Sequence, residues 1–231
     1  MPPQKQRFSI VQLIFVVIAV ALVTLFLLRF LDMGRFTEKR DIARGVSNCR
    51  QIIASLRIYA SERDGGGHTN RNQNAGPETA NEFFRVLFRE ETINDESIFG
   101  CPHSPFVPDG KFGNDPDFND ALAPGENHWM VTKGLSDSAP GSIPLVYENA
   151  AVAMWNPEWN ADAKHKPVPG RTWSSGIIVG MNDNSVTIQR LAAEQGAEVP
   201  LKNLPGSDKN LFTQHDSEDG SENFEVLDVE Q

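Results

Sequence analysis

The sequence has few cysteines and no excess of basic residues. Only Cys49 and Cys101 occur in 231 residues, and no C-x-x-C pair is present. A thioredoxin-type redox site needs a C-x-x-C pair and a four-cysteine zinc site needs four cysteines, so the sequence excludes both. The chain has 21 Lys and Arg residues and 31 Asp and Glu residues, which gives a net charge of −10. Because phosphate binding requires a basic surface, we do not expect a nucleic-acid partner.

Motifs for the common catalytic sites are also missing. The chain contains no G-x-S-x-G, no P-loop and no dinucleotide-binding glycine pattern. Its five histidines show neither H-x-x-x-H nor HExxH spacing. A zinc site would have to be assembled from distant residues such as His103, His128 and His165, and scattered histidines are more often ordinary surface or core residues. We therefore expect no catalytic residues and no enzyme, and an anchored hydrolase is the least favoured alternative.

A long apolar run stands at the N-terminus. Residues 10–28 are interrupted only by Gln12 and Thr24, and 19 helical residues rise about 28 Å, close to the thickness of the bilayer core. Lys5 and Arg7 precede the run, and no small-residue cleavage site of a secretory signal follows it. We predict a short basic cytoplasmic leader (1–7) and a membrane segment (8–31). The protein would then cross the inner (cytoplasmic) membrane once, with its C-terminal domain periplasmic or extracellular.

The helical pattern continues beyond the apolar run. Apolar residues recur at alternating spacings of four and three, which places them on one stripe of a helix: Ile42, Val46, Cys49, Ile53, Leu56 and Ala60. No proline occurs between Phe8 and Asp64, and the glycines at 65–67 can end the helix. Residues 32–64 are therefore predicted to be an amphipathic helix that continues into a globular head.

The remainder of the chain predicts a small mixed domain. Pro77 opens a second helix with an apolar face made of Ala80, Phe83, Phe84, Leu87 and Phe88. Candidate strands follow at 128–131, 143–147, 176–181 and 185–191, with a hairpin turn at 182–184. The predicted fold class is α+β, with one long transmembrane-plus-amphipathic helix packed on a small antiparallel sheet. The head spans 65–206, and the tail 207–231, with eight acidic residues and one lysine, is predicted to be flexible.

The two cysteines suggest a disulfide. In an exported domain a lone pair most simply forms one, and closing a loop of about 50 residues would stabilise the fold by about 4 kcal/mol. Cys49 lies on the apolar stripe, where Cys101 could meet it. The alternative is two unrelated buried thiols, which would suit a cytoplasmic domain.

One acidic segment has the ligand spacing of a calcium loop. Asp115, Asp117, Asn119 and Glu126 stand at positions 1, 3, 5 and 12 of that pattern. Position 6 is Asp120 where the motif needs glycine, so a solvated acidic turn is the alternative. No other cofactor is expected.

An aromatic pair raises a binding alternative. Trp155 and Trp159 flank a carboxylate and could bind a carbohydrate or a peptide. The favoured alternative is that they cover the edge of a small sheet.

The N-terminal segment matches the pattern G-F-T-L-I-E-L-L-V-V-I-A-I-I-A-I-L at Phe8, the stretch 9–11, Leu13 and the stretch 16–19. In this pattern it resembles the prepilin family, which includes type IV pilins and type II secretion pseudopilins. Arg7 stands where the family has the glycine before the cleavage point, and Gln12 where it has the assembly glutamate. The resemblance implies a processing junction at Arg7 and Phe8 and an assembly position at Gln12, and it leaves open whether residues 1–7 are removed.

Later segments are similar to prepilin-like families of Planctomycetes and Verrucomicrobia. The matching segments are 42–53, 99–102 with its Phe-Gly-Cys-Pro sequence, 127–129 and 134–137. The resemblance implies a pilin-like structural or secretion-associated protein whose partners are the lipid bilayer and other pilin-like subunits or a secretion apparatus. The alternative is a signal-anchored binding module that does not assemble.

Overall fold

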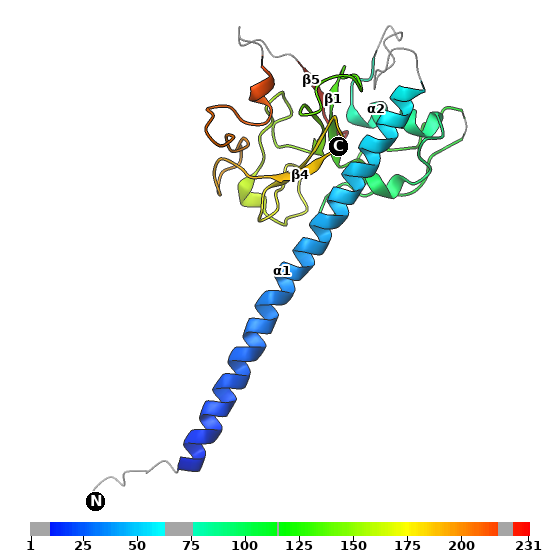
Figure 1. Cartoon of the computed structure of the whole chain (residues 1–231). Coiled ribbons are helices and arrows are strands. Elements are labelled where there is room, and N and C mark those ends of the chain that lie inside the picture. Colours follow the sequence, from blue (N-terminus) through cyan, green and yellow to red (C-terminus); the bar gives the residue numbers. More distant parts are fainter. Residues whose placement is uncertain (1–9, 63–75, 115, 217–223) are drawn as a thin grey trace, which may run out of the picture. The chain divides into compact units, whose positions relative to one another are not determined.

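The computed structural model describes residues 10–62, 76–114, 116–216 and 224–231 (Figure 1). By its internal contacts the chain divides into two compact units, residues 1–40 and 41–231. Helix α1 (Ile10–Ser61) is one continuous α-helix of 52 residues, as the absence of proline from this segment predicted. The glycines at 65–67, expected to end it, lie outside the described residues.

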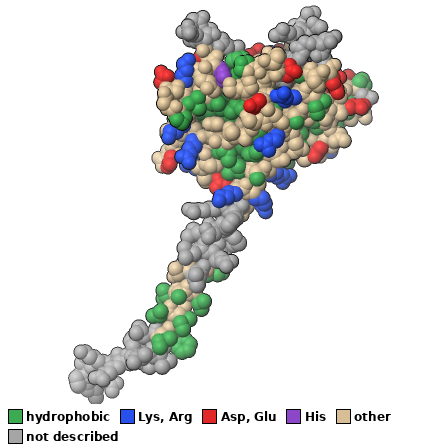
Figure 2. Space-filling view, in the orientation of Figure 1, with side chains coloured by type: hydrophobic (Ala, Val, Ile, Leu, Met, Phe, Trp, Pro, Cys, Tyr) green, Lys and Arg blue, Asp and Glu red, His purple; other side chains and the backbone are tan. Residues whose placement is uncertain are grey.

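The N-terminal part of α1 exposes apolar side chains. Phe15 and Phe26 are 69% and 66% exposed, and the neighbouring large hydrophobic residues are more than half exposed as well. Figure 2 shows such side chains on opposite sides of the helix. Among the described residues, no helix is both long enough and apolar enough to cross a membrane. Arg7 and Phe8 lie outside these residues, as does the side chain of Gln12.

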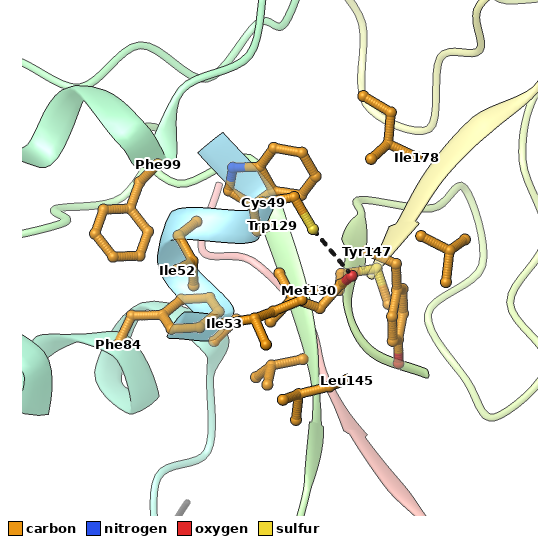
Figure 3. Close-up of a cluster of buried hydrophobic side chains, with 14 of the residues drawn as sticks. Cys49, Ile52, Ile53, Phe84, Phe99, Trp129, Met130, Leu145, Tyr147 and Ile178 are labelled. Carbon is orange, nitrogen blue, oxygen red and sulfur yellow. Dashed lines mark hydrogen bonds between the residues drawn. The ribbon is translucent and has the colours of Figure 1, made fainter. Parts of the chain in front are cut away.

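The C-terminal part of α1 buries the predicted stripe. Ile42, Cys49, Ile53, Leu56 and Ala60 are buried, whereas Val46 is half-buried. Two further residues, Ile52 and Tyr59, join the buried face. The apolar periodicity therefore predicted correctly which face of the helix enters the core (Figure 3).

Glycine lets α1 approach the sheet closely. A Cβ at Gly180 would lie 2.3 Å from Ile53 Cδ1 and 2.7 Å from Cys49 Sγ. On the helix side, a Cβ at Gly45 would lie 2.6 Å from Ile178 Cδ1. These distances are far below van der Waals contact, so a larger residue at either position would push the helix away from the sheet.

The second helix, α2 (Ala80–Arg89), matches the prediction. Thr79 is its N-cap, because the Thr79 side chain accepts a hydrogen bond from Glu82 N at 3.1 Å. Its predicted apolar face is buried, and the Phe84 ring lies 5.2 Å from that of Phe99. Phe99 ends the short 3₁₀ helix η1 (Glu96–Phe99), so this aromatic contact joins α2 to the segment before Cys101.

Five antiparallel strands form one sheet in the order β4-β3-β2-β1-β5. The strands are β1 (Trp129–Lys133), β2 (Pro144–Glu148), β3 (Ile177–Met181), β4 (Val186–Gln189) and β5 (Glu225–Leu227). Helices packed against this antiparallel sheet make the α+β fold. The predicted hairpin joins β3 to β4, where Asn184 has a positive φ of 68° and Ser185 N donates to Asp183 Oδ1 at 2.8 Å.

The C-terminal residues correct the prediction of a flexible tail. Strand β5 pairs with β1, with Leu227 opposite Val131, and the side chains of Leu227 and Val229 are buried. Leu211 and Phe212 are buried as well, ahead of residues 217–223, which lie outside the described part. The prediction was wrong because it relied on the acidic composition of the tail. These four apolar residues pack both described parts of the tail against the core.

Candidate functional site

A buried polar cluster surrounds the end of β2. Glu148 is the last residue of this strand, His128 precedes β1, and Cys101 follows η1. Arg171 and Trp173 come from the loop that leads into β3. All five side chains are buried among apolar residues, so the chemistry of the cluster is set by its internal contacts.

Glu148 accepts hydrogen bonds at both carboxylate oxygens. His128 Nε2 lies 3.1 Å and Arg171 Nη2 lies 3.2 Å from Oε1. Ile178 N donates to Oε2 at 2.8 Å, and Trp173 Nε1 lies 3.0 and 3.1 Å from the two oxygens. The carboxylate therefore connects two loops, the segment before β1 and the segment before β3, to the neighbouring strands β2 and β3.

These contacts keep Glu148 ionised. Burial alone raises its pKa, but the Arg171 guanidinium and the hydrogen bonds from His128 and Ile178 outweigh it and hold the pKa below its usual range. Arg171 and Glu148 thus form a fully buried ion pair.

His128 is a neutral imidazole with a defined tautomer. Asn149 Oδ1 accepts from Gly170 N at 2.7 Å, so its Nδ2 is the group that donates to His128 Nδ1 at 2.7 Å. The proton therefore sits on Nε2, which donates to Glu148. Burial lowers the pKa of His128, and the neighbouring carboxylate offsets this only in part.

Arg171 is the cation of the cluster. Its Nη2 donates to Pro102 O at 2.8 Å and lies 3.2 Å from Cys101 Sγ, and its guanidinium stacks 4.0 Å from the centre of the Trp173 ring. Within the described part of the chain, Nε and Nη1 have no hydrogen-bond partner.

The two cysteines are free thiols, so the predicted disulfide is not formed in the structure. Cys49 Sγ donates to Val146 O at 3.5 Å (dashed in Figure 3), whereas Cys101 Sγ donates to Glu148 Oε1 at 3.7 Å. Each thiol donates a hydrogen bond to a different acceptor, which explains how both can stay buried without a disulfide between them. Burial, together with the Glu148 carboxylate, raises the pKa of both thiols.

The cluster contains three potential metal ligands. The ligand atoms of Cys101, His128 and Glu148 lie within 4.8 Å of one another. However, the Arg171 guanidinium contacts two of these three atoms, and a second cation beside it would be repelled. We therefore assign the positive charge of this site to Arg171 and not to a metal.

The other histidines considered for zinc do not join His128. The rings of His103 and His165 lie 6.2 Å apart on exposed residues, and His103 Nε2 contacts Asp41 Oδ2 at 3.3 Å. The pair Trp155 and Trp159 is buried, with Phe212 against both rings. These tryptophans fill the core and offer no open binding face.

A cavity of about 230 Å³ reaches one member of the cluster, Cys101, between Arg44, Asn48 and Phe106. Because a raised pKa keeps Cys101 protonated, it is a poor nucleophile. The neutral imidazole of His128 points its one proton into the ion pair, so it has no free nitrogen directed at a substrate. The arrangement supports cohesion of the fold far better than acid–base or nucleophilic chemistry.

The structure does not show the four proposed calcium ligands gathered at one site. Asp115 lies outside the described residues, and Asp117 and Asn119 are exposed. Glu126 instead lies with Glu96 and Asp109, their carboxylate oxygens within 4.8 Å of one another. Burial, reinforced by the Glu96 charge, raises the pKa of Glu126.

Glu96 in this group already has backbone partners. Its two oxygens accept from Gly110 N at 2.7 Å and Leu122 N at 2.6 Å. This carboxylate therefore fixes the loops around it.

Sequence reasoning did not single out Glu148 or Arg171. A usable signal was present, because Glu148 directly follows the apolar stretch 143–147 and lies in the fully buried segment 143–150. A charged residue inside such a run predicts a buried partner of opposite charge. Comparisons with protein-family models, with curated proteins and with solved structures found no match to this chain.

Proposed function

We propose that this protein is a pilin-like (pseudopilin-like) structural or secretion-associated subunit of the inner membrane. One observation carries the proposal: a single helix, α1, combines an exposed apolar segment with a segment packed in the core of an α+β unit. This arrangement agrees with the prepilin resemblance of residues 8–19. In the proposed topology residues 8–31 anchor the chain, and residues 41–231 lie outside the cytoplasm.

The exposed apolar segment needs a nonaqueous environment. The described side chains of residues 14–24 and 26 are all exposed, and apart from Thr24 all are apolar. Removing apolar surface from water contributes about 25 cal/mol per Å², so such a segment is stable when lipid or neighbouring helices cover it. A helix that is apolar on every side is typical of a membrane span or the interior of a helical assembly.

Membrane extraction tests the anchor. We expect the full-length protein to stay in the membrane pellet at alkaline pH and Val17→Arg/Ile18→Arg to be extracted, since each arginine in a bilayer costs about 2.5–3.5 kcal/mol. Ser47→Arg, on the exposed face of the same helix, is the matched control and should remain in the pellet. Extraction of the unaltered protein would remove the support for anchoring.

The alternative of a signal-anchored binding module that does not assemble is favoured by Arg7 and Gln12, which depart from the prepilin pattern. The mass of the N-terminal peptide from native membranes separates the two functions. A peptide that begins at Phe8 identifies a processed subunit, whereas one that retains residues 1–7 favours the binding module. In a host with prepilin peptidase, Arg7→Gly/Gln12→Glu should be cleaved before Phe8, and an uncut double variant would contradict the pilin-like proposal.

A further inference from the structure

A second cavity, of about 490 Å³, opens beside strands β3 and β4. The segment 172–176, which leads into β3, forms one wall, and the segment 190–194, which follows β4, forms another. Lys164 and Lys202 complete the lining. All of these residues belong to the unit 41–231.

The lining is basic in an acidic protein. Lys164, Arg190 and Lys202 face the cavity together with one carboxylate, Glu194, although the whole chain has a net charge of −10. Within the part of the chain that the structure describes, none of the three cationic side chains makes a hydrogen bond or an ion pair. Three unpaired cations around one hollow create a local positive potential that favours an anion.

Backbone hydrogen bonds hold this rim in place. Lys202 N donates to Arg190 O at 2.8 Å, and Leu191 pairs with Leu201 as an isolated β-bridge. The backbones of Arg190 and Lys202 are therefore held opposite each other at this bridge. Two cationic side chains therefore start from adjacent backbone positions on the rim of the cavity.

Hydroxyl groups add hydrogen-bonding capacity. Thr172 lines the cavity and is fully buried, yet its Oγ1 has no hydrogen-bond partner in the described structure. Ser175 lines the same wall, next to Ser174, whose Oγ lies 2.9 Å from His165 Nε2. A buried hydroxyl without a partner is destabilising, so the Thr172 hydroxyl leaves one hydrogen bond unfilled in the wall of this cavity.

We propose that this cavity binds the oxyanion group of a small polar ligand: a sulfate, a phosphate ester or a carboxylate. Arg190, Lys202 and Lys164 bind the anionic group, the Thr172 hydroxyl donates to it, and Glu194 accepts from a hydroxyl of the attached scaffold. The volume lies within the range of small-molecule sites, about 300–1,000 Å³. This inference does not depend on the membrane anchor or on assembly.

Calorimetric titration of the full-length protein in a nonionic detergent tests the proposal. Sodium sulfate, sodium phosphate, glucuronate and glucose 6-phosphate are titrated separately at constant ionic strength, so that nonspecific screening is the same throughout. We expect one-to-one saturation by at least one of them. Similar affinities for phosphate and glucose 6-phosphate identify a free ion as the ligand, and at least tenfold tighter binding of glucose 6-phosphate than of phosphate, or of glucuronate than of sulfate, identifies a carbohydrate-borne group.

Charge-removing variants locate the binding. Arg190→Gln/Lys202→Gln should weaken binding at least tenfold, whereas Lys209→Gln, an exposed lysine outside the lining, should stay within twofold of the unaltered protein. Thr172→Val should weaken binding at least threefold without lowering the melting temperature. The proposal is overturned if none of the four anions saturates, or if the double variant binds as tightly as the unaltered protein. Unchanged affinity in Thr172→Val would overturn the assignment of that hydroxyl.

Discussion

Replacing Glu148 by glutamine should destabilise the fold strongly. The substitution keeps the shape of the side chain but removes the charge opposite Arg171 and turns an amide NH₂ toward groups that themselves donate. Breaking a buried ion pair by removing one partner costs about 3–5 kcal/mol, because the other charge is left buried without compensation. With about 2–4 °C per kcal/mol for a domain of this size, the melting temperature should fall by about 6–20 °C.

Denaturation of the full-length protein in detergent, followed by the fluorescence of its buried tryptophans, measures this effect. A double-mutant cycle with Arg171→Met isolates the pair: we expect the double variant to lose at least about 1 kcal/mol less than the sum of the single variants. Glu198→Gln, at an exposed position, is the matched control and should lie within about 0.5 kcal/mol of the unaltered protein. A loss below about 1 kcal/mol for Glu148→Gln, or strict additivity in the cycle, would refute the reasoning.

Three further predictions concern the same core. The folded-state pKa values of His128 and Glu148 are both lowered, so the unfolded chain takes up these protons first, and stability should fall with pH below about 6.5 and again below about 4.3. Melting temperatures between pH 8 and pH 3 measure both losses. Gly180→Ala should cost about 1–3 kcal/mol in urea denaturation, because the new methyl group would overlap Ile53. Cys49 should not react with a thiol reagent in the native protein and should react after unfolding without reductant, and the same holds for Cys101.

Each of these three predictions can be contradicted by a specific result. A melting temperature that is constant between pH 7 and pH 5 would contradict the lowered pKa of the buried His128, and one that is constant between pH 5 and pH 3 would contradict the lowered pKa of Glu148 in the buried ion pair. Gly76→Ala is the control for Gly180→Ala, because the nearest side-chain atom to its added Cβ lies 3.4 Å away. Equal stability of the two alanine variants would contradict the close approach of α1 to β3. Absence of thiols after unfolding would indicate a disulfide.

The helices and four of the strands could be predicted because their signal is local. Apolar spacing of three and four marks the buried face of α1 and of α2, and the polar turn at 182–184 marks the β3–β4 hairpin. Strand β5 was missed because three residues within an acidic segment are too few to outweigh composition. The alternation of Leu227 and Val229, both buried, was the available signal.

The buried cluster could not be predicted because its contacts join distant parts of the chain. Cys101 and Arg171 are separated by 70 residues, and His128 and Glu148 by 20. No local period places such residues together; their meeting depends on strand order and on the loops between the strands. Likewise, the sequence gives no sign that Arg190 and Lys202 are more than ordinary surface charges. The backbone pairing of their segments places both at one cavity.

The position of β5 has a consequence for the order of biosynthesis. Residues 225–230, which are made after β1 and α2, close the β1 edge of the sheet and contact the start of α2. Asp228 O accepts from Ala80 N at 2.7 Å, and Glu230 Oε1 accepts from Thr79 Oγ1 at 2.6 Å. Until the ribosome has released these residues, β1 has an unpaired edge and α2 lacks part of its N-terminal support. In the proposed topology α1 is in the membrane before these residues are made, so the extracytoplasmic unit completes its fold only after residues 225–230 have crossed the membrane.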